Sequence, residues 1–335
     1  MRLHNHIAAA ALALALSATL AAQQQPTGEK PAVISAIPGV IAKGAKWQRI
    51  WQGPFNSDGM TAAADGSVLF AQEQANAVMK LWPDGSSWAA YPYAKGAGAV
   101  SVDAQGRVFT VERTCTDPGL KPVPCAEATR VTQLAPEHKV LADKFADGKG
   151  LGRLNDIQAD GHGGAWYTQG GLYHVAADGT VSTVAEGNGM FTNGVALSPD
   201  GKTLYVTNKQ VIVAFDVAPD GAASNKRDLV TLANEEKGFG GDGLAVDSAG
   251  RLYVTGDAGI HVIEPSGKEL GVIPVPRRSI TLAFAGPDRR TLYVGAMGGV
   301  DPDGKEWATP QGVRNDAMTI YKVATLASGP KNRPK

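Results

Sequence analysis

Residues 193–208 read NGVALSPDGKTLYVTN, and this stretch contains the unit from which the fold is built. Asn193 precedes a short apolar run, a Pro-Asp-Gly turn follows, and a second run rich in Leu, Tyr and Val ends the unit. The same layout recurs at 242–256, DGLAVDSAGRLYVTG, and at 155–168, NDIQADGHGGAWYT. Short apolar runs joined by Gly-containing turns predict antiparallel β-hairpins.

The turn of this unit recurs along the chain. Its aspartates are Asp65, Asp103, Asp160, Asp200, Asp247 and Asp288, so the steps are 38, 57, 40, 47 and 41 residues. Units of about 40 residues match the four-stranded blade of a β-propeller. The pattern therefore predicts an all-β fold, a six-bladed β-propeller, over residues 44–326. The long step contains an insertion, which includes Cys115 and Cys125.

Two further apolar runs lie outside the six repeats. Residues 46–51, KWQRIW, precede the first unit, and residues 319–323, TIYKV, follow the last one. Pairing them in one blade would close the ring and remove two exposed strand edges. A pair of β-sandwiches is the alternative all-β interpretation, and the even spacing argues against it.

The composition is that of an ordinary soluble globular protein, with 43% hydrophobic and 19% charged residues among 335. The formal net charge is zero, so the totals indicate no nucleic-acid partner. A repeat architecture accommodates this length in one domain.

The amino terminus has the pattern of a signal peptide over residues 1–22. Arg2 is followed by an Ala- and Leu-rich run over 7–20, and small residues then offer a cleavage position. We expect a periplasmic or secreted protein that is free of the membrane after cleavage; an uncleaved membrane anchor is the alternative. Residues 23–43 are expected to form an unstructured lead-in, and residues 327–335 a flexible tail.

Cys115 and Cys125 are the only cysteines. Export places them in an oxidising compartment, so we expect a disulfide that closes the loop between them. This loop is predicted to lie at the mouth of the propeller channel as part of a lid. Metal binding by the two thiols is the alternative, although no further Cys or His is close enough in sequence to complete a tetrahedral set.

Several motifs resemble the SMP-30/gluconolactonase family, also called regucalcin-like. They are R-x-N-D at 153–156, N-G-x-x-x-S-P-D-G at 193–201, D-G-x-x-x-D-x-x-G at 242–250, and the run at 284–294. The resemblance covers residues 57–323 and rests on the order and spacing of the motifs, because each one alone is a common turn. It implies a six-bladed propeller that hydrolyses lactones with a divalent metal.

The resemblance also implies site residues. The family holds its metal with a Glu in blade one, an Asn and an Asp, which correspond here to Asp58, Asn193 and Asp242. Asp58 departs from the pattern, since its carboxylate reaches one methylene less than that of Glu. A second frame for blade one would use Gln52-Gly53-Pro54. Arg153 is implied as a substrate-binding residue, and Asn155 as a neighbour of the metal that contacts substrate or water.

Carboxylates and amides form an oxygen-only ligand shell, which suits Ca²⁺ best, with Mn²⁺, Mg²⁺ and Zn²⁺ as alternatives. Asp242 could accept the proton of an attacking water, while Asn155 and Arg153 hold lactone hydroxyls or the developing oxyanion. We expect Asp58, Asn193 and Asp242 to converge at the propeller axis. The resulting hypothesis is an exported, monomeric, metal-dependent lactone hydrolase that acts on a small lactone. The alternative is a non-catalytic ligand-binding or scaffold propeller with a structural calcium.

Overall fold

The computed structural model describes residues 28–114, 127–187, 189–233, 235, 240–309, 312–313 and 317–331. Its regular structure in these ranges is almost entirely β-strand, and the only helix there is a single 3-10 turn at Glu73–Ala75. Within the same ranges no helix has the length and apolarity needed to cross a bilayer.

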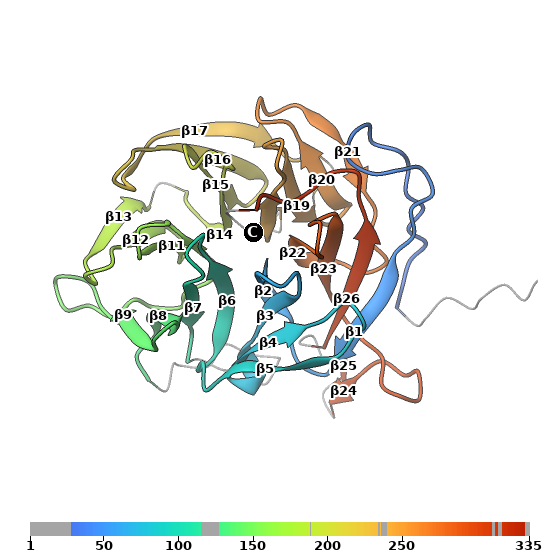
Figure 1. Cartoon of the computed structure of the whole chain (residues 1–335), viewed down its shortest axis with the longest axis horizontal. Coiled ribbons are helices and arrows are strands. Elements are labelled where there is room, and N and C mark those ends of the chain that lie inside the picture. The colour runs from blue at the N-terminus through green and yellow to red at the C-terminus, as the bar shows by residue number, and fades with distance from the viewer. Residues whose placement is uncertain are drawn as a thin grey trace, which may run out of the picture.

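Six four-stranded antiparallel sheets form a ring around a central axis (Figure 1). Blade one contains β2 (Asp58–Ala62), β3 (Val68–Gln72), β4 (Ala77–Leu81) and β5 (Ser87–Pro92). Blade two contains β6 (Ala97–Val102), β7 (Val108–Glu112), β8 (Arg130–Ala135) and β9 (Lys139–Ala142). Blade three contains β10 (Ile157–Ala159), β11 (Ala165–Thr168), β12 (Leu172–Val175) and β13 (Val181–Ala185).

The remaining blades complete the ring. Blade four contains β14 (Thr192–Leu197), β15 (Thr203–Asn208), β16 (Val211–Val217) and β17 (Ala223–Thr231). Blade five contains β18 (Leu244–Val246), β19 (Leu252–Gly256), β20 (Gly259–Ile263) and β21 (Glu269–Ile273). Blade six contains β22 (Ser279–Ala285), β23 (Thr291–Met297), β26 (Met318–Ala324) and β1 (Gln48–Gly53). The six-bladed propeller is confirmed.

Blade six is closed by both ends of the propeller chain. Strand β1 pairs antiparallel with β26, from Gln48 opposite Lys322 to Gly53 opposite Met318. This pairing is the one expected for the two runs outside the repeats. The pairing covers one edge of each strand and completes the four-stranded sheet of blade six, which closes the ring. A short hairpin of β24 (Ala308–Thr309) and β25 (Gly312–Val313) projects from this blade.

The core lies between the faces of neighbouring blades. The second strands β3, β7 and β19 are buried along their whole length, because each of their faces is covered by an adjacent blade. This explains why they read as continuous apolar runs. Large aromatic side chains fill the spaces between blades, among them Trp166, Tyr253 and Tyr293, which are at most 1% exposed.

The recurring aspartates have the structural role expected for turns. Oδ1 of Asp247 accepts hydrogen bonds from the backbone amides of Ala249 and Arg251, and Gly250 has a φ of +82°. Asp103 makes the corresponding bonds in blade two, to Gln105 and Arg107. Side-chain capping and a residue tolerant of positive φ together define these turns.

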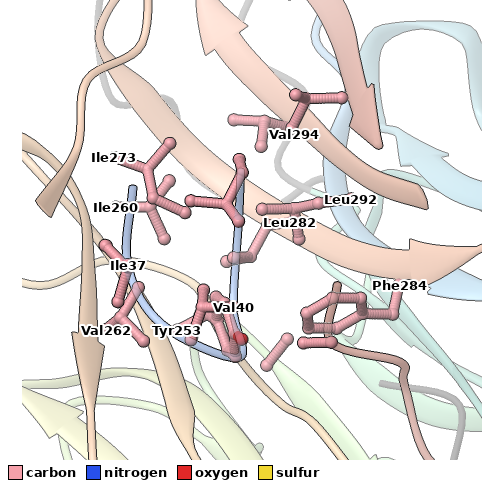
Figure 2. Close-up of a cluster of buried hydrophobic side chains, with 14 of the residues drawn as sticks. Ile37, Val40, Tyr253, Ile260, Val262, Ile273, Leu282, Phe284, Leu292 and Val294 are labelled. Carbon is pink, nitrogen blue, oxygen red and sulfur yellow. The ribbon is translucent and has the colours of Figure 1, made fainter. Parts of the chain in front are cut away.

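The segment 28–43 differs from the unstructured lead-in expected from its composition. Ile34, Ile37, Val40 and Ile41 are buried in a cluster with residues of blades five and six (Figure 2). In Figure 1 this segment runs along the outside of the ring beside β21. The sequence AVISAIPGVIA supplies enough apolar side chains to cover the outer joint between two blades, and their burial holds the segment in place.

Within the tail expected to be flexible from 327 onward, residues 327–330 are also packed. Ala327 is buried in the same cluster, and the backbone amides of Leu326 and Ala327 both donate to the carbonyl of Val40. Residues 1–27, 115–126 and 332–335 lie outside the described residues. The expected signal peptide and the Cys115–Cys125 disulfide therefore fall outside them as well.

Candidate functional site

The predicted site residues all lie where the first strand of a blade begins. Asp58 opens β2, Asn193 is the second residue of β14, and Asp242 precedes β18. Asn155 and Arg153 precede β10. The first strands contact one another around the ring in the order β2, β6, β10, β14, β18, β22 and back to β2, so they are the strands that surround the axis. The residues that precede or open them therefore lie at the same end of the ring of inner strands.

Irregular pairing marks this end of the inner strands. The register between the first and second strand shifts between Asp58 and Met60 in blade one, and between Thr192 and Val195 in blade four. Blades two and six have the same irregularity, at Gly98 and Ile280. Such bulges bend the strand and re-aim side chains, and they are common beside functional sites.

The alternative frame for blade one is excluded by position. Gln52 belongs to β1, the outermost strand of blade six, and its Nε2 donates to the carbonyl of Val300 at 2.8 Å. Asp58, in contrast, opens the innermost strand of blade one. Asp58 is therefore the residue that stands in the position expected for the blade-one ligand.

Buried threonines on the preceding blade hold the backbone of two candidate metal ligands. The hydroxyl of Thr168 donates to the carbonyl of Asn193 at 2.5 Å, and that of Thr207 donates to the carbonyl of Asp242 at 2.8 Å. In addition, the amide of Gly194 donates to the carbonyl of Asp242 at 3.1 Å. The backbones of Asn193 and Asp242 are thus fixed relative to one another across a blade boundary.

The electrostatics of Asp242 show that negative charges crowd the axis. Its side chain is only partly buried by surface area but lies deep among protein atoms, and this burial raises the pKa of its carboxyl. The charges of Asp58 and Asp156 raise it further, whereas Arg278 and Arg113 oppose the rise, and the resulting pKa is about 8. Carboxylates that repel one another in this way favour protonation or a bound cation.

Arg113 is a charged residue at this site that the sequence motifs did not indicate. It follows β7 and its side chain is 6% exposed. Nη1 lies 2.9 Å from Oε2 of Glu73 and 3.3 Å from Oδ2 of Asp58. Burial lowers the pKa of Arg113, but the negative charges of Glu73 and Asp58 outweigh that effect and leave it raised, so the group is a permanent cation.

The two residues implied in substrate binding lie beside this cation. Oδ1 of Asn155 accepts a hydrogen bond of 2.9 Å from Nη2 of Arg113. Arg153 is exposed, and its Nη2 lies 3.6 Å from Oε1 of Glu73. Glu73 itself was not singled out in the sequence, because it belongs to no motif and follows a buried strand.

Asp156, the last residue of the R-x-N-D motif, connects two blades. Its Oδ1 accepts a hydrogen bond of 2.8 Å from the backbone amide of Ile157, and its Oδ2 accepts one of 2.9 Å from the backbone amide of Val195. A carboxylate with both oxygens bonded to backbone amides is a positioning group rather than a free base.

The donor set fits a hard divalent cation. Among the described residues no cluster of three or more His, Cys, Asp or Glu side chains is arranged for metal binding, so the candidate shell combines two carboxylates with amide oxygen. Oδ1 of Asp58 accepts from its neighbour's amide and Oδ2 from Arg113, yet each carboxylate oxygen has a second lone pair available. Burial and the charges of Asp58 and Asp156 raise the pKa of Asp242, and a bound cation would relieve the repulsion between these carboxylates.

Comparison with curated proteins gives partial matches to lactonases. The chain is 34% identical over 190 residues to a pentonolactonase of Haloferax volcanii; the match covers 53% of this chain and 64% of that protein. It is 23% identical over 298 residues to a gluconolactonase of Zymomonas mobilis, covering 77% of this chain and 78% of that protein. The chain thus matches somewhat under two thirds of the length of the haloarchaeal relative.

Solved structures share the fold. A gluconolactonase from Xanthomonas campestris superposes with a TM-score of 0.66 at 19% identity, over 90% of this chain and 96% of that one. A regucalcin from Agrobacterium tumefaciens, described as a calcium-binding protein, superposes with a TM-score of 0.59 at 16% identity, over 82% and 92% of the two chains. The model of the SMP-30/Gluconolactonase/LRE-like region matches residues 56–298, which is most of the propeller, and the chain belongs to this family.

Proposed function

We propose that this protein hydrolyses small lactones with the help of a divalent cation held by Asp58, Asn193 and Asp242. The observation that carries the proposal is that Asp58, Asn193 and Asp242 stand at the same end of the inner strands of three blades. Burial raises the pKa of the Asp242 carboxyl, and the charges of Asp58 and Asp156 raise it further, to about 8. The matches to proteins named as lactonases indicate the substrate class.

When bound, the cation would polarise the lactone carbonyl and lower the pKa of an attacking water. Asp242, which would ligate or border the cation, would take up the water's proton as general base. Arg153 is exposed and can bind lactone hydroxyls, and the amide nitrogen of Asn155 can donate to the developing oxyanion. Calcium is the proposed cation because oxygen is the only ligand type in the set.

A lactone panel tests this proposal. The purified protein is assayed with glucono-δ-lactone and pentonolactones by proton release, after chelation and after addition of Ca²⁺, Mn²⁺, Mg²⁺ or Zn²⁺. Turnover should disappear on chelation and return with one or more of the cations. If chelation changes only the melting temperature and no lactone is hydrolysed in any condition, the protein is a scaffold or binding propeller with a structural cation.

We further propose that the protein is exported, cleaved near residue 22 and active as a monomer. The signal-like pattern of residues 1–22 supports export. Export in turn supports a Cys115–Cys125 disulfide, which would close a loop that contributes to lactone selectivity. Amino-terminal sequencing of the mature protein, together with thiol-specific labelling before and after reduction, tests both points. Free thiols in the exported protein would contradict the disulfide and the lid.

A further inference from the structure

The guanidinium of Arg113 uses all of its donors inside the protein. Nε donates to the carbonyl of Leu154 at 2.9 Å, and Nη1 donates to Asp58 and Glu73. Nη2 donates to the carbonyl of Asn155 at 3.0 Å and to its side-chain oxygen at 2.9 Å. Five N–H groups are all that a guanidinium has, so none remains for a substrate. Arg113 therefore acts on other protein groups and does not bind the reacting molecule.

The Arg113 side chain occupies space that is available because residue 98 is a glycine. Gly98 lies near the start of β6, where other blades carry Asp58, Asn193 or Asp242. A Cβ added at Gly98 would lie 2.3 Å from Nε and 2.6 Å from Cζ of Arg113. Blade two thus contributes no ligand of its own from this strand. The arginine at the end of the next strand, β7, fills the space instead.

The contacts of Arg113 link two parts of the candidate site that belong to different blades. Asp58 is the candidate ligand from blade one, and Asn155 is the candidate substrate-side amide before blade three. Both are bonded to the same rigid, planar group, at Nη1 and Nη2 respectively.

We propose that Arg113 is a positioning residue, which fixes the Asp58 carboxylate and the Asn155 amide relative to one another and so sets both cation affinity and lactone binding. Asp58 has a shorter side chain than the Glu expected at its position, and a fixed partner compensates by limiting its rotation. Glu73, whose side chain is 5% exposed, serves as the second counter-charge that makes a buried guanidinium tolerable. The lactone part of this inference rests on the proposed function, whereas the cation part does not.

Two variants separate the geometry from the charge. Arg113→Lys keeps the positive charge but loses the planar fork. Gly98→Ala keeps the guanidinium but introduces a Cβ into its space. Arg107→Lys is the matched control, because Arg107 is also ion-paired in blade two, with Asp103 at 2.5 Å, but belongs to a turn. For each variant, the Ca²⁺ dissociation constant is measured by calorimetry, together with kcat, KM and the melting temperature.

We expect Arg113→Lys and Gly98→Ala each to weaken Ca²⁺ binding or lower kcat/KM by about 10-fold or more, the usual effect of removing a group that orients metal ligands. Arg107→Lys should change neither quantity. In the Arg113→Lys, Asn155→Ala double variant, the losses in kcat/KM should be less than additive, since the two residues act through one contact.

Other results would overturn the inference. If Arg113→Lys and Gly98→Ala both keep the Ca²⁺ affinity and the KM of the wild type, Arg113 does not position the site. Losses that follow the melting temperature and appear equally in Arg107→Lys would show a merely structural ion pair. If the wild type binds Ca²⁺ but hydrolyses no lactone, the proposed function fails while the calorimetric comparison still decides the role of Arg113. If the wild type binds no Ca²⁺, the positioning role toward a cation is wrong.

Discussion

Oδ2 of Asp156 accepts a hydrogen bond of 2.9 Å from the backbone amide of Val195, which joins the third blade to the fourth beside the axis. Asp156 closes the R-x-N-D motif, and Val195 stands two residues after Asn193. Two motifs that are separate in sequence are therefore one structural unit. The side chains of this unit are positioned by a bond that neither motif contains alone.

Replacing Asp156 by Asn should damage this unit. Both carboxylate oxygens accept from backbone amides, whereas an Asn side chain has one accepting oxygen, so one amide would lose its partner. A buried unsatisfied donor costs about 1–3 kcal/mol. Urea unfolding should show a loss of this size, with lower turnover. Asp178→Asn, in an exposed turn of the same blade, is the control and should be nearly neutral; equal losses in both would refute a special role for Asp156.

Asp242 and Asp247 should respond in opposite ways to substitution by Ala. Asp242→Ala removes the candidate ligand and base, so lactone hydrolysis should be lost while the fold persists. Asp247 is fully buried and bonds to Arg251 and Tyr253 as well as to its turn, so Asp247→Ala should lower stability and preserve turnover per folded molecule. Activity normalised to the folded fraction measures this. Equal activity losses would mean that a ligand has been confused with a turn residue.

The raised pKa of Asp242 predicts a pH-dependent stability in the presence of a chelator. Between about pH 4 and pH 8 the folded protein keeps a proton on Asp242 that the unfolded chain has released, so stability falls as the pH rises through this range. Asp242→Asn carries no such proton. The melting temperature of the variant relative to wild type should therefore increase with pH. A constant difference between the two melting temperatures at all pH values would contradict the raised pKa of this carboxyl.

Thr207 should be needed for the position of Asp242. Its hydroxyl donates to the Asp242 carbonyl at 2.8 Å and accepts from the amide of Gly194 at 2.7 Å. Thr207→Val keeps the shape but removes both bonds, so we expect a loss of about 1–3 kcal/mol together with reduced turnover. Thr207→Ser retains the hydroxyl and should restore turnover. Failure of Ser to outperform Val would show that the hydroxyl is not what matters.

The packed lead-in should contribute to global stability. Ile37 is 5% exposed in the cluster between blades five and six, and its truncation to Ala should cost about 2–5 kcal/mol. Val33, in the same segment, is 82% exposed, and Val33→Ala should have little effect. Denaturant midpoints of the two variants provide the comparison. Identical midpoints would mean that the segment is docked without stabilising the propeller.

The number and phase of the blades follow from the sequence because they depend on local signals. The Asp-Gly turns, the apolar runs between them and the spacing of about 40 residues all act within single hairpins. The closing pair of β1 and β26 could also be predicted, since only those two runs were left without a blade. The positions of Asp58, Asn193 and Asp242 at the starts of inner strands follow from the same phase.

What the tertiary structure alone decided are the contacts between blades. Arg113 meets Glu73 and Asp58 across 40 and 55 residues of sequence, and no periodic pattern marks a residue for such a contact. Its place also depends on the absence of a side chain at Gly98, which lies on the neighbouring strand of the same blade. The packing of the lead-in likewise depends on distant residues, because the joint that buries its apolar side chains is formed by blades five and six, more than 200 residues later.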